Sequence, residues 1–104
     1  MPSNTPLVKV SNTEKLGAHV VLHGETVTEA SDFANLQAAA ENRVFVHPYD
    51  DELIIAGQGT VALEMFEERP ELGVIVVPIG GGGLMAGCAI AAGALNPAAE
   101  VIGV

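Results

Sequence analysis

Short apolar runs alternate along the chain with longer segments that have the spacing of amphipathic helices. The short runs are rich in β-branched residues and predict four strands, at residues 18–24, 44–46, 72–80 and 100–104. The segments between them predict helices at about 26–42, 60–68 and 84–95. Strands that alternate with helices in this way indicate an α/β fold of three layers with a mostly parallel sheet. The unbroken Val/Ile run within 72–80 predicts a strand covered on both faces.

Local signals mark the ends of the predicted helices. Thr26 stands three residues before Glu29, which is the spacing of a capping box and predicts that a helix starts there. Pro97 follows the last predicted helix and ends it. The stretch HPYDDELIIAGQGT, residues 47–60, is predicted to be a loop, and it is the best candidate for a hinge.

Composition limits the size of the molecule and its partners. A chain of 104 residues is enough for one small domain or part of one. Apolar residues make up 49% of it and charged residues 16%, so disorder is not expected. The net charge is −9, and no nucleic-acid partner is expected because the four cations are scattered, at Lys9, Lys15, Arg43 and Arg69.

The uncharged run 74–95 has about the length that a membrane helix needs. Pro78 and four glycines divide it into two short pieces, so no membrane partner is expected. Gly83 and Gly87 form a GxxxG pattern, which in a soluble helix allows close approach to a strand. The N-terminus does not have the basic and apolar regions of a secretory signal, so a cytoplasmic location is expected.

Four consecutive glycines, Gly80 to Gly83, join the strand 72–80 to the helix 84–95. Glycines that open a helix present several backbone N–H groups at its positive end, which suits a phosphate group. One glycine would be enough for the turn, so the run of four favours phosphate binding. The Walker pattern GxxxxGK[ST] is absent, which disfavours an NTPase. Residues 81–86 fit GxGxxA, so a dinucleotide-binding module remains an alternative.

Other candidate sites are weaker. His19 and His23 would share one face of the predicted strand 18–24 near Glu25, but they have no third placed ligand, and no metal site is predicted. The acidic run 50–52 is interpreted as a solvated loop that caps a helix. Cys88, the only cysteine, is interpreted as a buried small apolar residue.

Three stretches taken together resemble the fold type II pyridoxal-phosphate (PLP) enzymes, in particular L-threonine dehydratase (threonine ammonia-lyase), L-serine dehydratase and serine racemase. These stretches are TPLVKV…LGAHVVLHG, VFVHPYDDELIIAGQGTVALE and VVPIGGGGLMAG…AEVIGV, and they cover nearly the whole chain. The resemblance implies a tryptophan synthase β-like architecture and pyridoxal 5'-phosphate as cofactor. It further implies that backbone N–H groups hold the cofactor phosphate, at Gly80, Gly81, Gly82, Gly83 and Leu84. His47 and Tyr49 match a loop of the family and are assigned positioning roles.

The resemblance also implies a fragment, with 1–47 as the later part of the small domain and 48–104 as the start of the large domain. The Schiff-base lysine of the family stands upstream of the matching part, and neither Lys9 nor Lys15 takes its place. We therefore expect a fragment of an ammonia-lyase that deaminates L-threonine or L-serine to a 2-oxo acid, inactive by itself. The alternatives are a dinucleotide-binding module and a catalytically silent oligomerising domain. Exposed strand edges predict a homo-oligomer.

Overall fold

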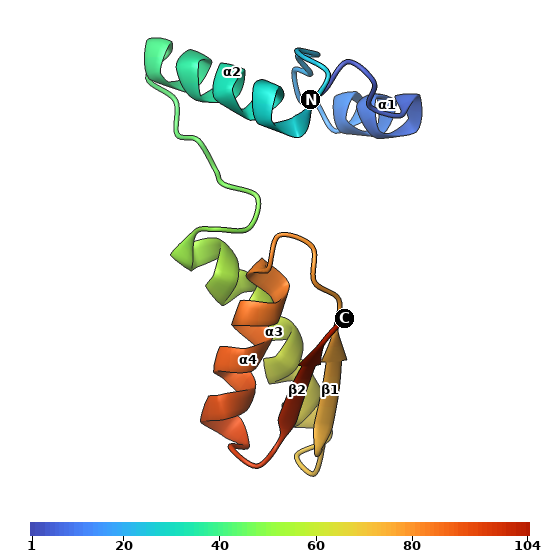
Figure 1. Cartoon of the computed structure of the whole chain (residues 1–104), viewed down its shortest axis with the longest axis vertical. Coiled ribbons are helices and arrows are strands. Elements are labelled where there is room, and N and C mark those ends of the chain that lie inside the picture. The colour runs from blue at the N-terminus through green and yellow to red at the C-terminus, as the bar shows by residue number, and fades with distance from the viewer. The chain divides into compact units, whose positions relative to one another are not determined.

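The computed structural model describes all of residues 1–104 and divides into two compact units, Met1–Phe45 and Val46–Val104 (Figure 1). The first unit contains two helices, α1 (Leu7–Lys15) and α2 (Val27–Ala40). The second unit contains two helices and two strands, in the order α3 (Glu52–Glu68), β1 (Val74–Val77), α4 (Gly83–Leu95) and β2 (Glu100–Gly103). No helix is both long and apolar enough to cross a lipid bilayer.

The predicted capping box at the start of α2 is confirmed. The N–H of Glu29 donates to the Thr26 hydroxyl at 3.2 Å, and the Glu29 carboxylate accepts from the N–H groups of Glu25 and Thr26 at 2.7 and 3.2 Å. Gly24 precedes this box with φ +68°, and a Cβ there would meet the Glu29 side chain. Because these residues are neighbours in sequence, local chemistry alone fixes the start of the helix.

The predicted strands 18–24 and 44–46 are wrong, since neither segment is a strand. The N-terminal NH3⁺ donates to the carbonyl of Val21, the N–H of His23 to Met1, and the N–H of Ser3 to Gly24. These few bonds do not make a ladder. A β-branched run becomes a strand only when a neighbouring strand pairs with it along its length.

No residue of α1 or α2 is buried. Leu7, Leu16 and Leu36 are 83%, 88% and 72% exposed, although all three are large apolar side chains. The aromatic contact of this unit is a stack of the His23 ring on Phe33, with centroids 4.0 Å apart. Hydrogen bonds and the capping box of α2 therefore hold the first unit together more than a hydrophobic core does.

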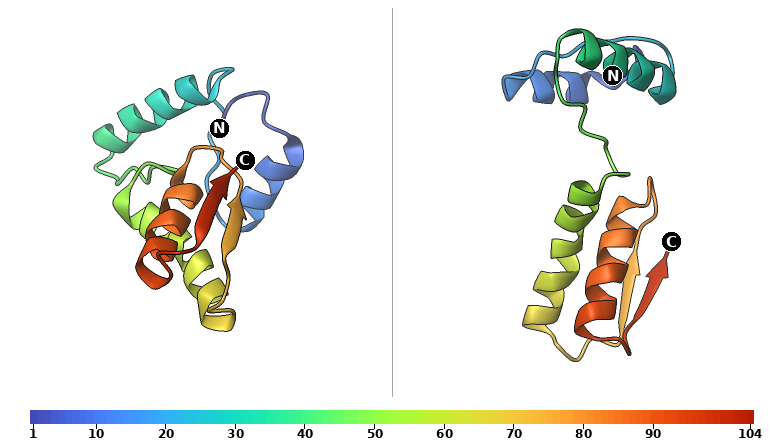
Figure 2. Two further views of the ribbon diagram at one scale, coloured as in Figure 1. Left: turned by 60° about the horizontal axis from the view of Figure 1, so that its bottom comes forward. Right: turned by 90° about the vertical axis from the view of Figure 1, so that its left-hand side faces the viewer.

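In the second unit, β1 and β2 pair in parallel and α4 makes the crossover between them (Figure 2). The register pairs Val74 with Glu100 and Val77 with Gly103. Two bonds carry the ladder beyond β1, from the N–H of Val104 to Val77 and from the N–H of Ile79 to the carbonyl of Val104. The α/β class and the parallel pairing are thus confirmed, with two strands in place of the four expected.

Only one face of this sheet is covered. Ile75 and Val77 are 4% and 3% exposed, whereas Val74 and Val76 on the opposite face are 50% and 60% exposed. The expectation that both faces of this strand are covered, as in a three-layer arrangement, is therefore wrong for these residues. Apolar composition indicates that a strand face can be buried, but it does not supply the element that buries it.

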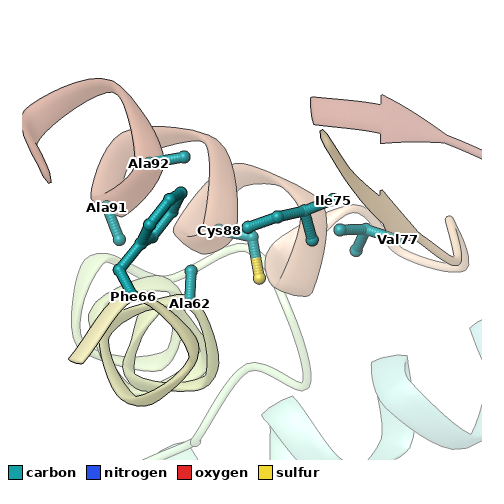
Figure 3. Close-up of a cluster of buried hydrophobic side chains, with 7 residues drawn as sticks. All are labelled: Ala62, Phe66, Ile75, Val77, Cys88, Ala91 and Ala92. Atoms are coloured by element: carbon teal, nitrogen blue, oxygen red, sulfur yellow. The ribbon is translucent and has the colours of Figure 1, made fainter. Parts of the chain in front are cut away.

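The core of the second unit lies between α3, α4 and the inner face of the sheet (Figure 3). Cys88 is 1% exposed there, as predicted, and it is a free thiol. The seven buried apolar residues come from α3, β1 and α4, and they are Ala62, Phe66, Ile75, Val77, Cys88, Ala91 and Ala92.

Helix α3 starts at Glu52, eight residues before the predicted start at Thr60, so much of the predicted loop is helical. The side chain of Asp51 caps it, accepting from the N–H groups of Leu53 and Ile54 at 2.9 and 3.2 Å. This confirms the interpretation of the acidic run as a helix cap. The glycines of this segment indicated a loop in the sequence, but in the fold Gly59 is buried in a helix contact.

Helices α3 and α4 touch backbone to backbone at Gly59 and Gly87. A Cβ on Gly59 would lie 2.9 Å from the carbonyl oxygen of Gly87. A Cβ on Gly87 would lie 2.5 Å from the nitrogen of Gly59 and would also overlap the carbonyl oxygen of Ile55. Gly87 of the GxxxG pattern therefore serves contact with helix α3 and not, as expected, with a strand, whereas Gly83 meets the backbone of Tyr49.

Alanine at Gly59 or Gly87 is expected to destabilise the second unit by about 1–3 kcal/mol or more, because the clash is with backbone that cannot turn aside. Gly57 and Gly93 lie in the same two helices with no atom within 4 Å of an added Cβ. Alanine there is expected to stabilise by about 0.5–1 kcal/mol. Thermal unfolding of the four variants, followed by circular dichroism, checks this, and equal costs within each helix would contradict it.

The capping box makes the start of α2 sensitive to acid. Hydrogen bonds from the backbone N–H groups of Glu25 and Thr26 hold the pKa of Glu29 below its usual 4.5. A lowered pKa gives stability that is complete above about pH 4.5 and is lost as the pH falls through the folded-state value. The NMR titration of Glu29 should therefore have its midpoint below 4.5, with the N–H shift of Glu25 following it. In Glu29→Gln the N–H of Glu25 should show no such titration. A midpoint for Glu29 at or above 4.5 in the wild type would show that the capping-box bonds do not lower its pKa.

Candidate functional site

The glycine loop lies at one end of the second unit, between the end of β1 and the start of α4. Helices α3 and α4 both begin at this end, and β1 and β2 both finish there (Figures 1 and 2). Gly80 and Gly81 are exposed and Gly82 is partly buried. Parallel strands followed by helix starts are where α/β proteins commonly bind ligands.

A row of backbone donors in this loop has no acceptor within the chain. The N–H of Ile79 donates to Val104 and the N–H of Ala86 donates to Gly82. No hydrogen bond uses the N–H groups between these two, which are those of Gly80, Gly81, Gly82, Gly83, Leu84 and Met85. The first N–H groups of a helix always lack an intrahelical acceptor, so those at the start of α4 can donate hydrogen bonds to acceptor atoms of another molecule.

The neighbouring helix α3 also begins with N–H groups that lack an intrahelical acceptor, but a side chain accepts from them. Its first N–H groups are met by the carboxylate of Asp51, which also places a negative charge at the positive end of the helix. The N-cap of α4 is Gly82, which has no side chain to play this part. Two helices thus start at the same end of the unit. The first N–H groups of α3 are capped by the Asp51 carboxylate, whereas those of α4 have no capping side chain and can bind an external anion.

Three of the four glycines are required by the fold of the chain itself, without any ligand. Gly82 has φ +93°, a left-handed conformation that glycine adopts without strain. A Cβ on Gly81 would overlap the ring of Tyr49, and a Cβ on Gly83 would lie 2.7 Å from the Tyr49 carbonyl oxygen. Only Gly80 has neither a left-handed φ nor an atom within 4 Å of an added Cβ. The run of four glycines is thus weaker evidence for a ligand than its length suggested.

Tyr49 reaches the loop from a turn that His47 organises. The Nδ1 atom of His47 accepts from the N–H groups of Tyr49 and Asp50 at 3.3 and 2.7 Å. The two rings meet edge to face, with centroids 4.7 Å apart. Sequence reasoning singled out both residues only through the family loop they match, because nothing in their spacing shows that Tyr49 packs on the glycines.

Charge near the loop does not favour anions. Arg69 is the only cation of the second unit, and it lies at the other end of α3, paired with Glu71 at 2.6 Å. Asp50, Asp51 and Glu52 stand next to the Tyr49 turn. Any anion at the loop therefore depends on N–H groups and on the dipole of α4, without help from a charged side chain.

Other candidates do not form a site. No group of three or more His, Cys, Asp or Glu side chains is arranged to hold a metal ion. A shallow pocket of about 200 Å³ lies at the opposite end of the helices from the glycine loop, and its lining is Phe66, Glu67, Pro70 and Leu95. The open start of α4 is therefore the candidate site of this chain.

The open start of α4 after a parallel strand fits both a phosphate-bearing cofactor and a dinucleotide, and comparison with known proteins separates the two. A family model described as "Pyridoxal-phosphate dependent enzyme" matches residues 1–104. The chain belongs to this family. The resemblance inferred from the three sequence stretches is thereby confirmed, and the family favours PLP over the dinucleotide alternative.

Individual PLP-dependent relatives cover the whole chain. It is 46% identical over 104 residues to an L-threonine ammonia-lyase of Thermotoga maritima, covering 100% of this chain and 26% of the relative. A threonine deaminase isoform 2 of Solanum lycopersicum superposes with a TM-score of 0.91 at 35% identity, over 99% of this chain and 28% of the other. Maize serine racemase superposes with a TM-score of 0.93 at 36% identity, over 98% and 31%.

These similar proteins are much longer than the chain described here. The 104 residues span between about a quarter and a third of each of the three relatives. What is shown is thus a partial fold type II PLP-enzyme domain, whose relatives include both lyases and racemases.

Proposed function

We propose that this chain provides the phosphate-binding part of a PLP-dependent ammonia-lyase that deaminates L-threonine or L-serine to a 2-oxo acid. The observation that carries the proposal is the open start of α4, where successive N–H groups have no acceptor within the chain. A phosphate monoester presents several oxygens that can accept such bonds. Similarity to threonine ammonia-lyase and threonine deaminase supports the reaction class.

The residues present fit the phosphate of the cofactor. Gly80 and Gly81 add no side chains of their own to the outer part of the loop, and the N–H groups of Gly82, Gly83 and Leu84 complete the turn into α4. Each bond from an N–H group to a charged oxygen contributes about 1.5–3 kcal/mol. Leu84 is partly buried and packs against the core, so its part in the loop is assigned to its backbone N–H group.

The chemistry itself belongs to the cofactor. When bound, PLP supplies the electron sink for removing the α-proton and eliminating the β-hydroxyl group. The loop described here holds the phosphate and thereby sets the position of the ring. By the resemblance, the Schiff-base lysine is not among these residues, and we propose that the 104-residue chain alone is inactive.

A substitution at Gly80 tests whether the glycines of the loop are needed for phosphate binding or only for packing within the chain. We expect Gly80→Ala to keep the fold, because its Cβ meets no atom of the chain, but to weaken the binding of inorganic phosphate about tenfold, which corresponds to about 1.4 kcal/mol. Gly73→Ala is the matched control, since an added Cβ there also meets nothing and Gly73 lies before β1, away from the loop.

A titration of the ¹⁵N-labelled chain with inorganic phosphate provides the measurement. In the wild type, the N–H signals from Gly80 to Met85 should shift, whereas those of Leu53 and Ile54 should not, because Asp51 already satisfies them. Unchanged loop signals, or an equal Kd for wild type and Gly80→Ala, would count against the proposal.

A second experiment tests the proposed absence of a cofactor lysine. Lys9 and Lys15 both lie on α1, and by the resemblance α1 corresponds to a small-domain helix of the family. We expect no stoichiometric lysine adduct after incubation with PLP, borohydride reduction and mass spectrometry of the peptides. A stoichiometric adduct at Lys9 or Lys15 would overturn the assignment, and free N-acetyl-lysine at the same concentration gives the background level.

A further inference from the structure

The ring of Tyr49 is in direct contact with the glycine loop, at the end of the second unit where α3 and α4 begin. The ring lies where a Cβ of Gly81 would be, and the Tyr49 backbone lies 2.7–3.1 Å from where a Cβ of Gly83 would be. Tyr49 thus touches the loop on both sides of Gly82, the residue whose left-handed φ turns the chain into α4.

We propose that Tyr49 is a positioning residue that fixes the direction of the loop N–H groups by covering Gly81 with its ring and supporting Gly83 with its backbone. This inference rests on the proposed function, because it concerns the same phosphate site. Tyr49 does not touch the reacting atoms in this role. It acts through the loop, because packing against Tyr49 restricts the loop to one conformation.

The loop needs such a support because its own bonding is sparse. No hydrogen bond within the chain holds the N–H groups of Gly80 to Gly83, and glycines have the largest conformational freedom of all residues. A loop that must be ordered at the moment of binding loses affinity by the cost of that ordering. Packing under an aromatic ring orders it beforehand.

The turn that carries Tyr49 is itself fixed at both ends. His47 accepts two backbone N–H bonds through Nδ1 and lies edge-on to the Tyr49 ring, and Asp51 anchors the next residues as the cap of α3. Tyr49 is 44% exposed and lies outside the buried core. Replacing it therefore changes the loop without removing a core side chain.

A double-mutant cycle tests the contact. Gly81→Ala in the wild type should lower the midpoint of thermal unfolding and weaken phosphate binding, because its Cβ has no room beside the ring. In the Tyr49→Ala background the same substitution should cost little, because the ring is gone. Equal costs of Gly81→Ala in the two backgrounds would show that Tyr49 and Gly81 are not coupled and would overturn the inference.

Phosphate binding supplies the readout that a purely structural role would not move. We expect Tyr49→Ala to raise the Kd for inorganic phosphate about tenfold, with changed N–H shifts from Gly81 to Gly83 and unchanged shifts in the second half of α4. Tyr49→Phe keeps the ring and should bind phosphate as the wild type does. Tyr49→Ala with a wild-type Kd, or Tyr49→Phe as weak as Tyr49→Ala, would overturn the inference.

The outcomes separate this inference from the proposed function. A wild-type chain whose loop N–H groups ignore phosphate contradicts the proposed function, and the inference falls with it. A wild-type chain that binds phosphate at the loop, together with a Tyr49→Ala variant that binds it equally well, contradicts the inference alone.

Discussion

The close approach of α3 and α4 at Gly59 and Gly87 is the constraint on which the second unit depends. Without side chains at the crossing, the two helix backbones come into direct contact, and the small residues Ala62, Cys88 and Ala91 continue the contact along the core. The same approach brings the start of α3 beside the start of α4, so that the Tyr49 turn meets the glycine loop. A packing requirement in the middle of two helices thus determines the geometry at their ends.

Helix ends give this unit its chemical character. Both helices begin at the edge where the strands finish, and each start concentrates unpaired N–H groups and positive potential. The carboxylate of Asp51 satisfies this at α3, whereas Gly82 offers no such group at α4. The two helix starts thus differ in whether a capping side chain satisfies their first N–H groups, and only the start of α4 leaves them without one.

Features that depend on residues close together in the sequence could be predicted, whereas features that depend on contacts between distant segments could not. The start of α2 depends on Thr26 and Glu29, which are neighbours, and the β1–α4–β2 order follows from apolar runs and glycines close in sequence. The strand expected at 18–24 was wrong because a strand needs a distant partner. The early start of α3 was missed because Gly57 and Gly59 indicated a loop, although the cap at Asp51 is local. The packing of Tyr49 on Gly81 was missed because a contact between separate elements determines it. The candidate loop itself could be located, but not the reason for three of its four glycines.

The distribution of charge around the loop bears on how an anion would reach it. The chain carries a net charge of −9, and the one cation of the second unit is paired at the far end of α3. At long range this charge repels an approaching phosphate, and only the N–H groups of the loop would offset the repulsion, at close contact. Dissolved salt shortens the reach of the repulsion more than it weakens the contact bonds. Association of phosphate with this chain should consequently become faster as ionic strength rises, the reverse of the behaviour of sites lined by lysine and arginine.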